Sequence, residues 1–197
     1  MTIIISGARI LTLQGPEEPR RGAALRDLGI IENGWLRIDG DRITRVAAGE
    51  VPASEEEGAE GDVIDAGGSV VMPCFVDCHT HACWAGHRLD EFEMSLAGKS
   101  YLEILEAGGG IMSTVRAVRE TDEDGLTLNL LRRLTGMIGL GTATAEVKSG
   151  YGLTTRDELK MLRAIHEASQ IMPQIIVGTF LGAHAIDPDN ANFVEQT

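Results

Sequence analysis

The stretch Pro73-Cys-Phe-Val-Asp-Cys-His-Thr-His81 has the pattern of a short apolar β-strand that ends in two histidines separated by one residue. Proline is tolerated where a strand begins, and Phe75 and Val76 are strand formers. Residues i and i+2 of a strand point to the same face, so His79 and His81 can aim both imidazoles at one ion. The stretch therefore predicts a strand that carries half of a metal site.

The residues beside this histidine pair allow structural as well as functional interpretations. Asp77 either orients a ligand histidine or is a carboxylate at the end of a strand, and the sequence leaves both open. Cys78 and Cys83 flank the pair, but strand alternation lets only one of them share a face with the histidines. We therefore expect both cysteines to be packing residues.

Composition and charge exclude several classes of protein. Hydrophobic residues make up 43% of the 197 residues, which is ordinary for a globular chain that buries a core. With 30 acidic and 17 basic residues the net charge is -13, which disfavours binding to nucleic acid and to anionic membranes. We therefore expect neither a nucleic acid nor a membrane as a partner.

The cysteines and the amino terminus indicate where the protein resides. The three cysteines lie between positions 74 and 83, which is a poor framework for disulfides. The sequence has no basic leader, and no apolar run reaches the roughly 18 residues that span a bilayer. We therefore expect a soluble, cytoplasmic protein.

Residues 1–70 are predicted to form a small β domain, the amino-terminal part of a β-sandwich-like unit. Turn residues at 39–41 separate two of its strands. The charged segments 15–27 and 51–61 are expected to be solvated loops. Strand patterns occupy positions 3–13, 34–38 and 42–47.

Residues 71–197 are predicted to be the first part of a metal-dependent (β/α) barrel. Strands and helices alternate here, which implies a parallel sheet, and functional groups follow the strands as they do in such barrels. The fold class expected is therefore α/β, a partial (β/α)8 TIM-type barrel, because only three strands are visible where eight close a barrel. The expected elements are a strand into His81, a helix at 126–138, a strand at 142–147, a helix at 155–171 and a strand at 174–180.

The helix expected at 155–171 carries its own start signal. Thr155 and Glu158 have the spacing of a capping box. Apolar residues expected to pack against the sheet recur at helical spacing at Leu159, Leu162, Ile165 and Ala168.

Several separated motifs match one family in its own order. They are Cys74–His81, Ala85–Phe92, Leu96–Leu105, Ala107–Ile111, Glu146–Leu153, Glu158–Leu162 and Thr179–His184. Together they resemble the imidazolonepropionase family of the amidohydrolase superfamily. The resemblance implies a metal-dependent hydrolase that uses zinc or iron. It implies hydrolysis of the cyclic amide C–N bond of 4-imidazolone-5-propanoate to N-formimidoyl-L-glutamate in histidine degradation.

The resemblance also implies roles for individual residues. His79 and His81 match the first two metal ligands, while Arg88, Tyr151 and His184 match residues that bind the substrate. The chemistry agrees, because Arg88 offers the planar fork of donors that a carboxylate accepts in bidentate fashion. The expected partner is a small-molecule substrate with a carboxylate. For the oligomeric state, a homodimer stays open.

His184 has two open interpretations, because an imidazole after a strand can be a third metal ligand or a substrate contact. The resemblance favours the substrate contact. We predict a catalytic role in which His184 donates to the ring carbonyl oxygen and stabilises the negative charge that forms there. In the family the remaining ligands and the general base come from later barrel strands, so we expect a truncated barrel.

Two other functions stay open. One is that of another cyclic amidohydrolase or deaminase with the same histidine pair. The other is a non-catalytic, truncated chain whose exposed sheet edge pairs with another chain. His87 and His166 are expected to be structural or exposed, and Gly108–Gly110 is expected to be a loop near the mouth of the site.

Overall fold

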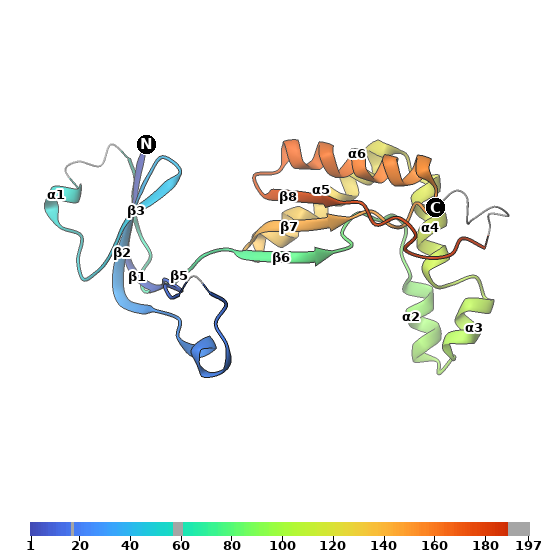
Figure 1. The fold of residues 1–197 in the computed structure, drawn as a ribbon, viewed down its shortest axis with the longest axis horizontal. Helices are drawn as coiled ribbons and strands as arrows, with labels where there is room; N and C mark the ends of the chain where they lie inside the picture. The colour runs from blue at the N-terminus through green and yellow to red at the C-terminus, as the bar shows by residue number, and fades with distance from the viewer. Residues whose placement is uncertain (17, 57–60, 189–197) are drawn as a thin grey trace. The chain divides into compact units, whose positions relative to one another are not determined.

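The computed structural model describes residues 1–16, 18–56 and 61–188. The chain divides into two compact units, Met1–Pro73 and Cys74–Thr197 (Figure 1). Among the described residues, no helix has the length and apolar character to cross a membrane.

The first unit is a five-stranded sheet in the order β3-β2-β1-β4, with β5 also paired to β1. We expected the amino-terminal part of a sandwich-like unit, and the described residues of this unit form one sheet. Its turn between β2 and β3 uses Gly40, whose φ of 63° lies in the left-handed region that glycine favours. Trp35 and Ile4 are buried on it. The strands are β1 (Thr2–Leu11), β2 (Ile30–Asp39), β3 (Arg42–Ala48), β4 (Val63–Asp65) and β5 (Val70–Val71).

Short helices occupy two segments that we expected to be loops. A 3-10 helix, η1, spans Gly22–Arg26, and a single helical turn, α1, spans Ala53–Glu56. Neither has a buried residue, so neither shows the apolar periodicity by which a sequence reveals a helix.

The second unit is built on three parallel strands in the order β6-β7-β8. These strands, β6 (Phe75–Thr80), β7 (Thr142–Lys148) and β8 (Ile175–Thr179), lie where the sequence predicted them. Helices α5 (Glu123–Gly139) and α6 (Thr155–Ile171) cover one face of the sheet (Figure 1). The result is a mixed α/β unit whose sheet is open and does not close into a barrel in the described part of the chain.

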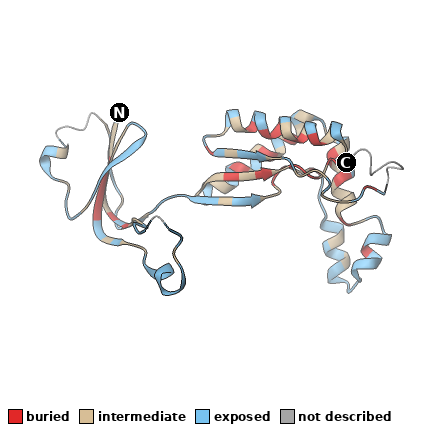
Figure 2. Cartoon of the chain, viewed as in Figure 1, coloured by how far each residue is buried: buried red, intermediate tan, exposed pale blue. Residues whose placement is uncertain are grey.

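The core of the second unit lies between this sheet and its two helices (Figure 2). Helix spacing explains which side chains are buried, because residues four apart share one face. Leu159 was expected in this core but is 48% exposed, and Leu162 is only partly buried. The fully buried residues of the sheet and these two helices are Leu126, Leu130 and Leu134 of α5, Ala145 and Val147 of β7, and Met161, Ala164 and Ala168 of α6.

The expected capping box at Thr155 is wrong by one residue. The cap is Thr154, whose Oγ1 accepts a hydrogen bond of 3.1 Å from the backbone N–H of Asp157. Glu158 takes no part in the cap, because its carboxylate binds the backbone of the preceding loop.

Three helices between β6 and α5 were missed: α2 (Leu89–Leu96), α3 (Tyr101–Glu106) and α4 (Ile111–Glu120). They lie beyond the carboxyl ends of the strands (Figure 1). Helix α2 buries no residue and α3 buries only Ile104, so both are short helices with little packing against a core. The segment Gly108–Gly110 is a connection, as predicted, and Gly110 with a φ of 82° precedes α4.

Candidate functional site

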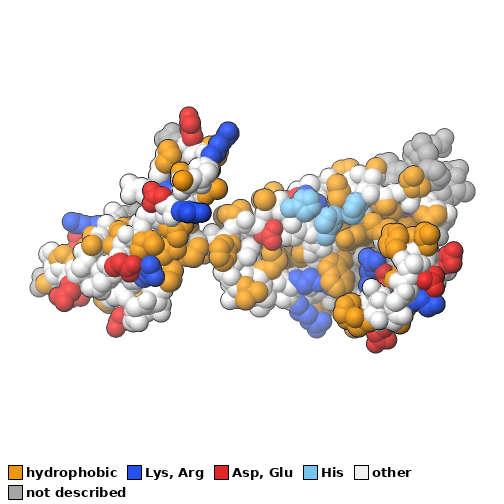
Figure 3. Space-filling model, turned by 90° about the horizontal axis from the view of Figure 1, so that it is seen from below, with side chains coloured by type: hydrophobic (Ala, Val, Ile, Leu, Met, Phe, Trp, Pro, Cys, Tyr) orange, Lys and Arg blue, Asp and Glu red, His pale blue; other side chains and the backbone are white. Residues whose placement is uncertain are grey.

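The two histidines lie at the carboxyl end of β6. The strand ends at Thr80, so His81 is the first residue past it, and the His79 and His81 ring centroids are 5.6 Å apart. Thr80 is held by β7, since its Oγ1 donates to the Glu146 carbonyl at 2.7 Å. Histidine side chains gather on one face of the second unit (Figure 3).

Asp77 serves the backbone at this strand end. Its Oδ1 accepts a hydrogen bond of 3.3 Å from the backbone N–H of His79. This contact favours the interpretation of Asp77 as a strand-end carboxylate over that of a partner for an imidazole.

His81 is the residue most suited to bind a metal ion. Burial lowers the pKa of its imidazole, and the neighbouring His184, His79 and Lys148 add to the effect, so the neutral form is favoured. Its Nδ1 is buried and has no hydrogen-bond partner among the described residues. A neutral imidazole with an unpartnered buried nitrogen fits a metal ligand. The described residues hold no cluster of three or more metal-ligating side chains, so this donor set is partial.

Tyr151 and His184 stand beside His81. The His184 ring stacks on His81 with centroids 5.0 Å apart, and the Tyr151 ring lies 5.5 Å from each of them. Burial raises the pKa of the Tyr151 hydroxyl, which keeps it a protonated donor. The structure thus brings together four of the predicted site residues, which are His79, His81, Tyr151 and His184.

A backbone contact determines how His184 presents its ring. Its Nδ1 lies 3.0 Å from the carbonyl oxygen of Gly150. A carbonyl only accepts, so Nδ1 carries the proton, and Nε2 holds the lone pair of the neutral ring. The ring nitrogen left for a ligand is therefore Nε2.

Arg88 opens onto the same cavity as His81. It precedes α2, and its guanidinium donates to both carboxylate oxygens of Glu91, at 2.7 Å from Nε and 2.5 Å from Nη2. This pair raises the pKa of Arg88 and lowers that of Glu91, which also accepts a hydrogen bond from the Gly110 N–H. The cavity, of about 330 Å³, is lined by His81, Trp84, His87, Arg88, Thr114 and Tyr151.

Sequence reasoning missed part of this cavity. His87 was expected to have a structural or exposed role; it is exposed and lines the cavity, and His166 is exposed on α6. Trp84 was not predicted to be part of the site, but it lines the cavity. Arg133 lies 3.6 Å from its ring centroid and donates to its carbonyl oxygen at 2.7 Å. No sequence signal marks that contact, because Arg133 is far along the chain.

The cysteines differ from one another. Cys83 is buried, and burial raises the pKa of its thiol to about 12, so it is a packing residue as predicted. Cys78 is exposed, so the expectation that it packs in the core is wrong. In β6 only Asp77 and Thr80 are partly buried and the other residues are exposed, Cys78 among them.

Comparisons with known proteins identify relatives of this chain. No family model matches the sequence. It is 41% identical over 178 residues to the imidazolonepropionase of Alkaliphilus oremlandii, covering 90% of this chain and 42% of that protein. It is 47% identical over 169 residues to that of Hyphomonas neptunium, covering 85% and 42%. The chain therefore spans about two fifths of the length of the relatives that it matches.

Solved structures share the fold of this chain over part of their length. Escherichia coli guanine deaminase matches 98% of this chain and 38% of its own, with a TM-score of 0.54 and 16% identity. An uncharacterized metal-dependent hydrolase from Pyrococcus furiosus matches 91% and 50%, with a TM-score of 0.53 and 15% identity. At such identities the likeness concerns the fold alone.

Proposed function

We propose that this chain, which is homologous to the amino-terminal part of imidazolonepropionases, supplies the first part of an imidazolonepropionase site. The reaction is the hydrolysis of the cyclic amide bond of 4-imidazolone-5-propanoate to N-formimidoyl-L-glutamate. The observation that carries the proposal is that the His81 ring lies 5.0–5.6 Å from the rings of His79, Tyr151 and His184, in a chain with 41% identity to such an enzyme. The fold proposed is the first three strands of a (β/α)8 barrel.

His79 and His81 are the residues that would hold the metal, zinc or iron. The orphaned Nδ1 of His81 and the lowered pKa of its ring fit this role. When bound, such a metal supplies a water of lowered pKa and polarises the carbonyl that is attacked. Two protein ligands fall short of the three that are typical of catalytic zinc, so a complete site would need at least one further ligand.

Arg88 would bind the substrate carboxylate. A guanidinium carries five N–H donors, and Glu91 engages two of them, which leaves the rest of the fork for a ligand. Tyr151 would add a neutral hydroxyl donor on the same cavity. A neutral purine would not need such a cation, and this favours the proposal over a deaminase of the same fold.

His184 would contact the substrate ring through Nε2, because Nδ1 is held by Gly150. To donate from Nε2 toward a developing oxyanion, the ring must carry both protons. A role as third metal ligand would instead use the Nε2 lone pair. The two roles therefore differ in what replacement of His184 does to metal content.

The test is an assay of the chain with zinc or iron(II), alone and together with the carboxy-terminal part of the Hyphomonas neptunium relative. We expect formimidoylglutamate to form with the two parts together. His184→Asn should lower turnover by 100-fold or more, since removal of one oxyanion donor costs about 10²–10³ in rate, and should leave the bound metal unchanged. Loss of metal in His184→Asn would make His184 a ligand. Turnover of guanine in place of imidazolone propanoate would contradict the proposal.

A further inference from the structure

We propose that Glu158 is the positioning residue of this site: its buried carboxylate holds the loop that presents Tyr151 and, through that loop, sets the orientation of His184. The proposal rests on the function proposed above. Glu158 lies in the first turn of α6 and is only 4% exposed. A buried carboxylate is costly unless donors surround it, so its contacts carry information about its role.

The three donors that surround Glu158 all belong to one loop. Its Oε2 accepts from the backbone N–H of Gly150 at 2.8 Å. Its Oε1 accepts from the N–H of Gly152 at 2.7 Å and from that of Leu153 at 2.9 Å. Tyr151 lies between these anchored residues, so the carboxylate fixes the backbone on both sides of it.

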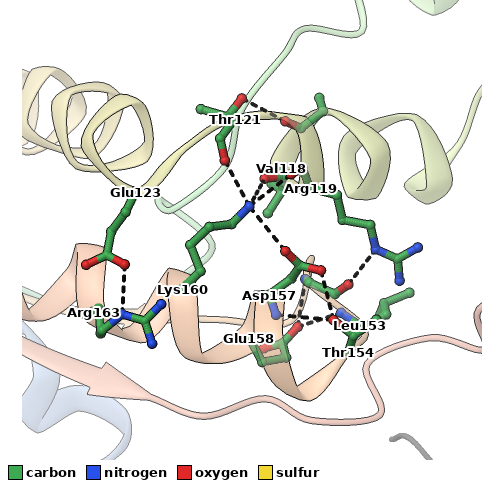
Figure 4. Close-up of polar contacts among 12 residues, drawn as sticks. Val118, Arg119, Thr121, Glu123, Leu153, Thr154, Asp157, Glu158, Lys160 and Arg163 are labelled. Carbon is green, nitrogen blue, oxygen red and sulfur yellow. Dashed lines mark hydrogen bonds and ion pairs between the residues drawn. The ribbon is translucent and has the colours of Figure 1, made fainter.

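The other side of the loop is held through its carbonyl groups. Arg119 of α4 donates from Nε to the Gly152 carbonyl at 2.9 Å, as part of the polar network around the start of α6 (Figure 4). The Gly150 carbonyl accepts from His184. Gly150 thus connects the two residues, because its N–H binds Glu158 and its carbonyl binds the imidazole.

The conformation of the loop requires this support. Gly150 has a φ of 110°, and a Cβ on it would lie 2.9 Å from Nδ1 of His184. Leu153 has a φ of 54°, which is unfavourable for a side chain with a Cβ. A loop with such backbone angles keeps them when its surroundings over-determine them. The carboxylate of Glu158 supplies that constraint.

Glu158→Gln provides a sharp test, because it exchanges one acceptor for a donor. With its oxygen at the Oε1 position, glutamine keeps the bonds to Gly152 and Leu153 and points its amide group at the Gly150 N–H. If the amide were flipped, the bonds to Gly152 and Leu153 would both be lost, whereas the first orientation loses only the bond to Gly150. We therefore expect the Gly150 amide to exchange hydrogen at least tenfold faster, with smaller changes at Gly152 and Leu153.

The second readout is the His184 ring. In the unaltered chain, long-range ¹H–¹⁵N spectra at pH 8 should show a proton on Nδ1, and Glu158→Gln should replace this single pattern by a mixture of tautomers. Arg163→Met is the matched control, because Arg163 is on the same helix but its exposed side chain binds Glu123 of α5 and not the loop. It should leave both the Gly150 amide and the His184 ring unchanged.

Unchanged Gly150 exchange and an unchanged His184 ring in Glu158→Gln would overturn the proposal, as would equal changes in Arg163→Met. If Glu158→Gln does not fold, the spectrum of the unaltered chain still tests the proposal. A His184 ring with its proton on Nε2 would contradict the proposed hydrogen bond from Nδ1 to the Gly150 carbonyl. These measurements need neither metal nor turnover. A failed activity assay would therefore count against the proposed function and leave this test intact.

Discussion

At the scale of single residues, burial decides chemistry that residue type leaves open. The sequence places three cysteines close together, and the structure buries Cys83 while it exposes Cys74 and Cys78. The pKa of Cys83 rises to about 12 because its thiolate would lose solvation. Proximity in sequence therefore does not make these thiols equivalent.

This difference predicts the reactivity of the thiols. At pH 8 in native buffer, an aromatic disulfide reagent should modify Cys74 and Cys78 within minutes and Cys83 at least 100-fold more slowly. In denaturant all three should react alike, which serves as the control. Because the folded pKa of Cys83 is raised, the folded chain should lose stability as pH rises above the unfolded thiol value of 9.0. Rapid modification of Cys83 in the folded chain would contradict the buried position.

At the scale of elements, α6 shows how far sequence patterns carry. Its bounds, Thr155–Ile171, agree with the range predicted from periodicity. Its cap does not, because Glu158 turns toward the preceding loop. The predicted buried face is correct at Ile165 and Ala168 and wrong at Leu159, which is exposed. Local spacing sets where a helix forms, whereas the neighbouring loop decides what its first turn binds.

Lys160 joins α6 to the end of α4 (Figure 4). Its Nζ donates to the carbonyl oxygens of Val118 and Thr121 at 2.8 Å and of Arg119 at 3.1 Å, groups that no longer have a helical partner. Lys160→Met should lower the free energy of unfolding by about 2 kcal/mol, since hydrogen bonds to a charged group contribute roughly 1.5–3 kcal/mol. Urea denaturation followed by circular dichroism measures the change.

Arg163→Met is the control for this prediction. Arg163 forms an ion pair with Glu123 at 2.7 Å, but the two side chains are 56% and 36% exposed. Exposed pairs contribute about 0–1 kcal/mol, so its loss should be smaller than that of Lys160. Equal losses in the two variants would show that Lys160 does not join the helices.

At the scale of the whole molecule, each unit contains its own core. One hydrophobic cluster consists of buried residues between positions 82 and 168, and another gathers Ala8, Ile10 and Leu36. Each unit also holds one tryptophan, since Trp35 is buried in the first and Trp84 packs against the core of the second. The two tryptophans therefore report on different cores.

We expect the two units to unfold in separate transitions. In urea, the fluorescence of Trp84→Phe follows Trp35 and that of Trp35→Phe follows Trp84, and their midpoints should differ. Unfolding that is all-or-none gives coincident transitions with every probe. A matching midpoint and slope in both variants, and in circular dichroism of the unaltered chain, would show a single cooperative unit instead.

The sequence by itself determined the strands β6, β7 and β8, the helices α5 and α6, and the residues that meet at the site. Strand alternation and helical periodicity are local, and the motifs lie just after strands whose carboxyl ends share one edge of a parallel sheet. Only the tertiary structure decided the burial of Glu158, the pairing of Arg88 with Glu91, and the exposure of Cys78. These depend on which groups the folded chain brings within hydrogen-bonding distance, and on which side chains it removes from water. No spacing along one segment specifies such contacts.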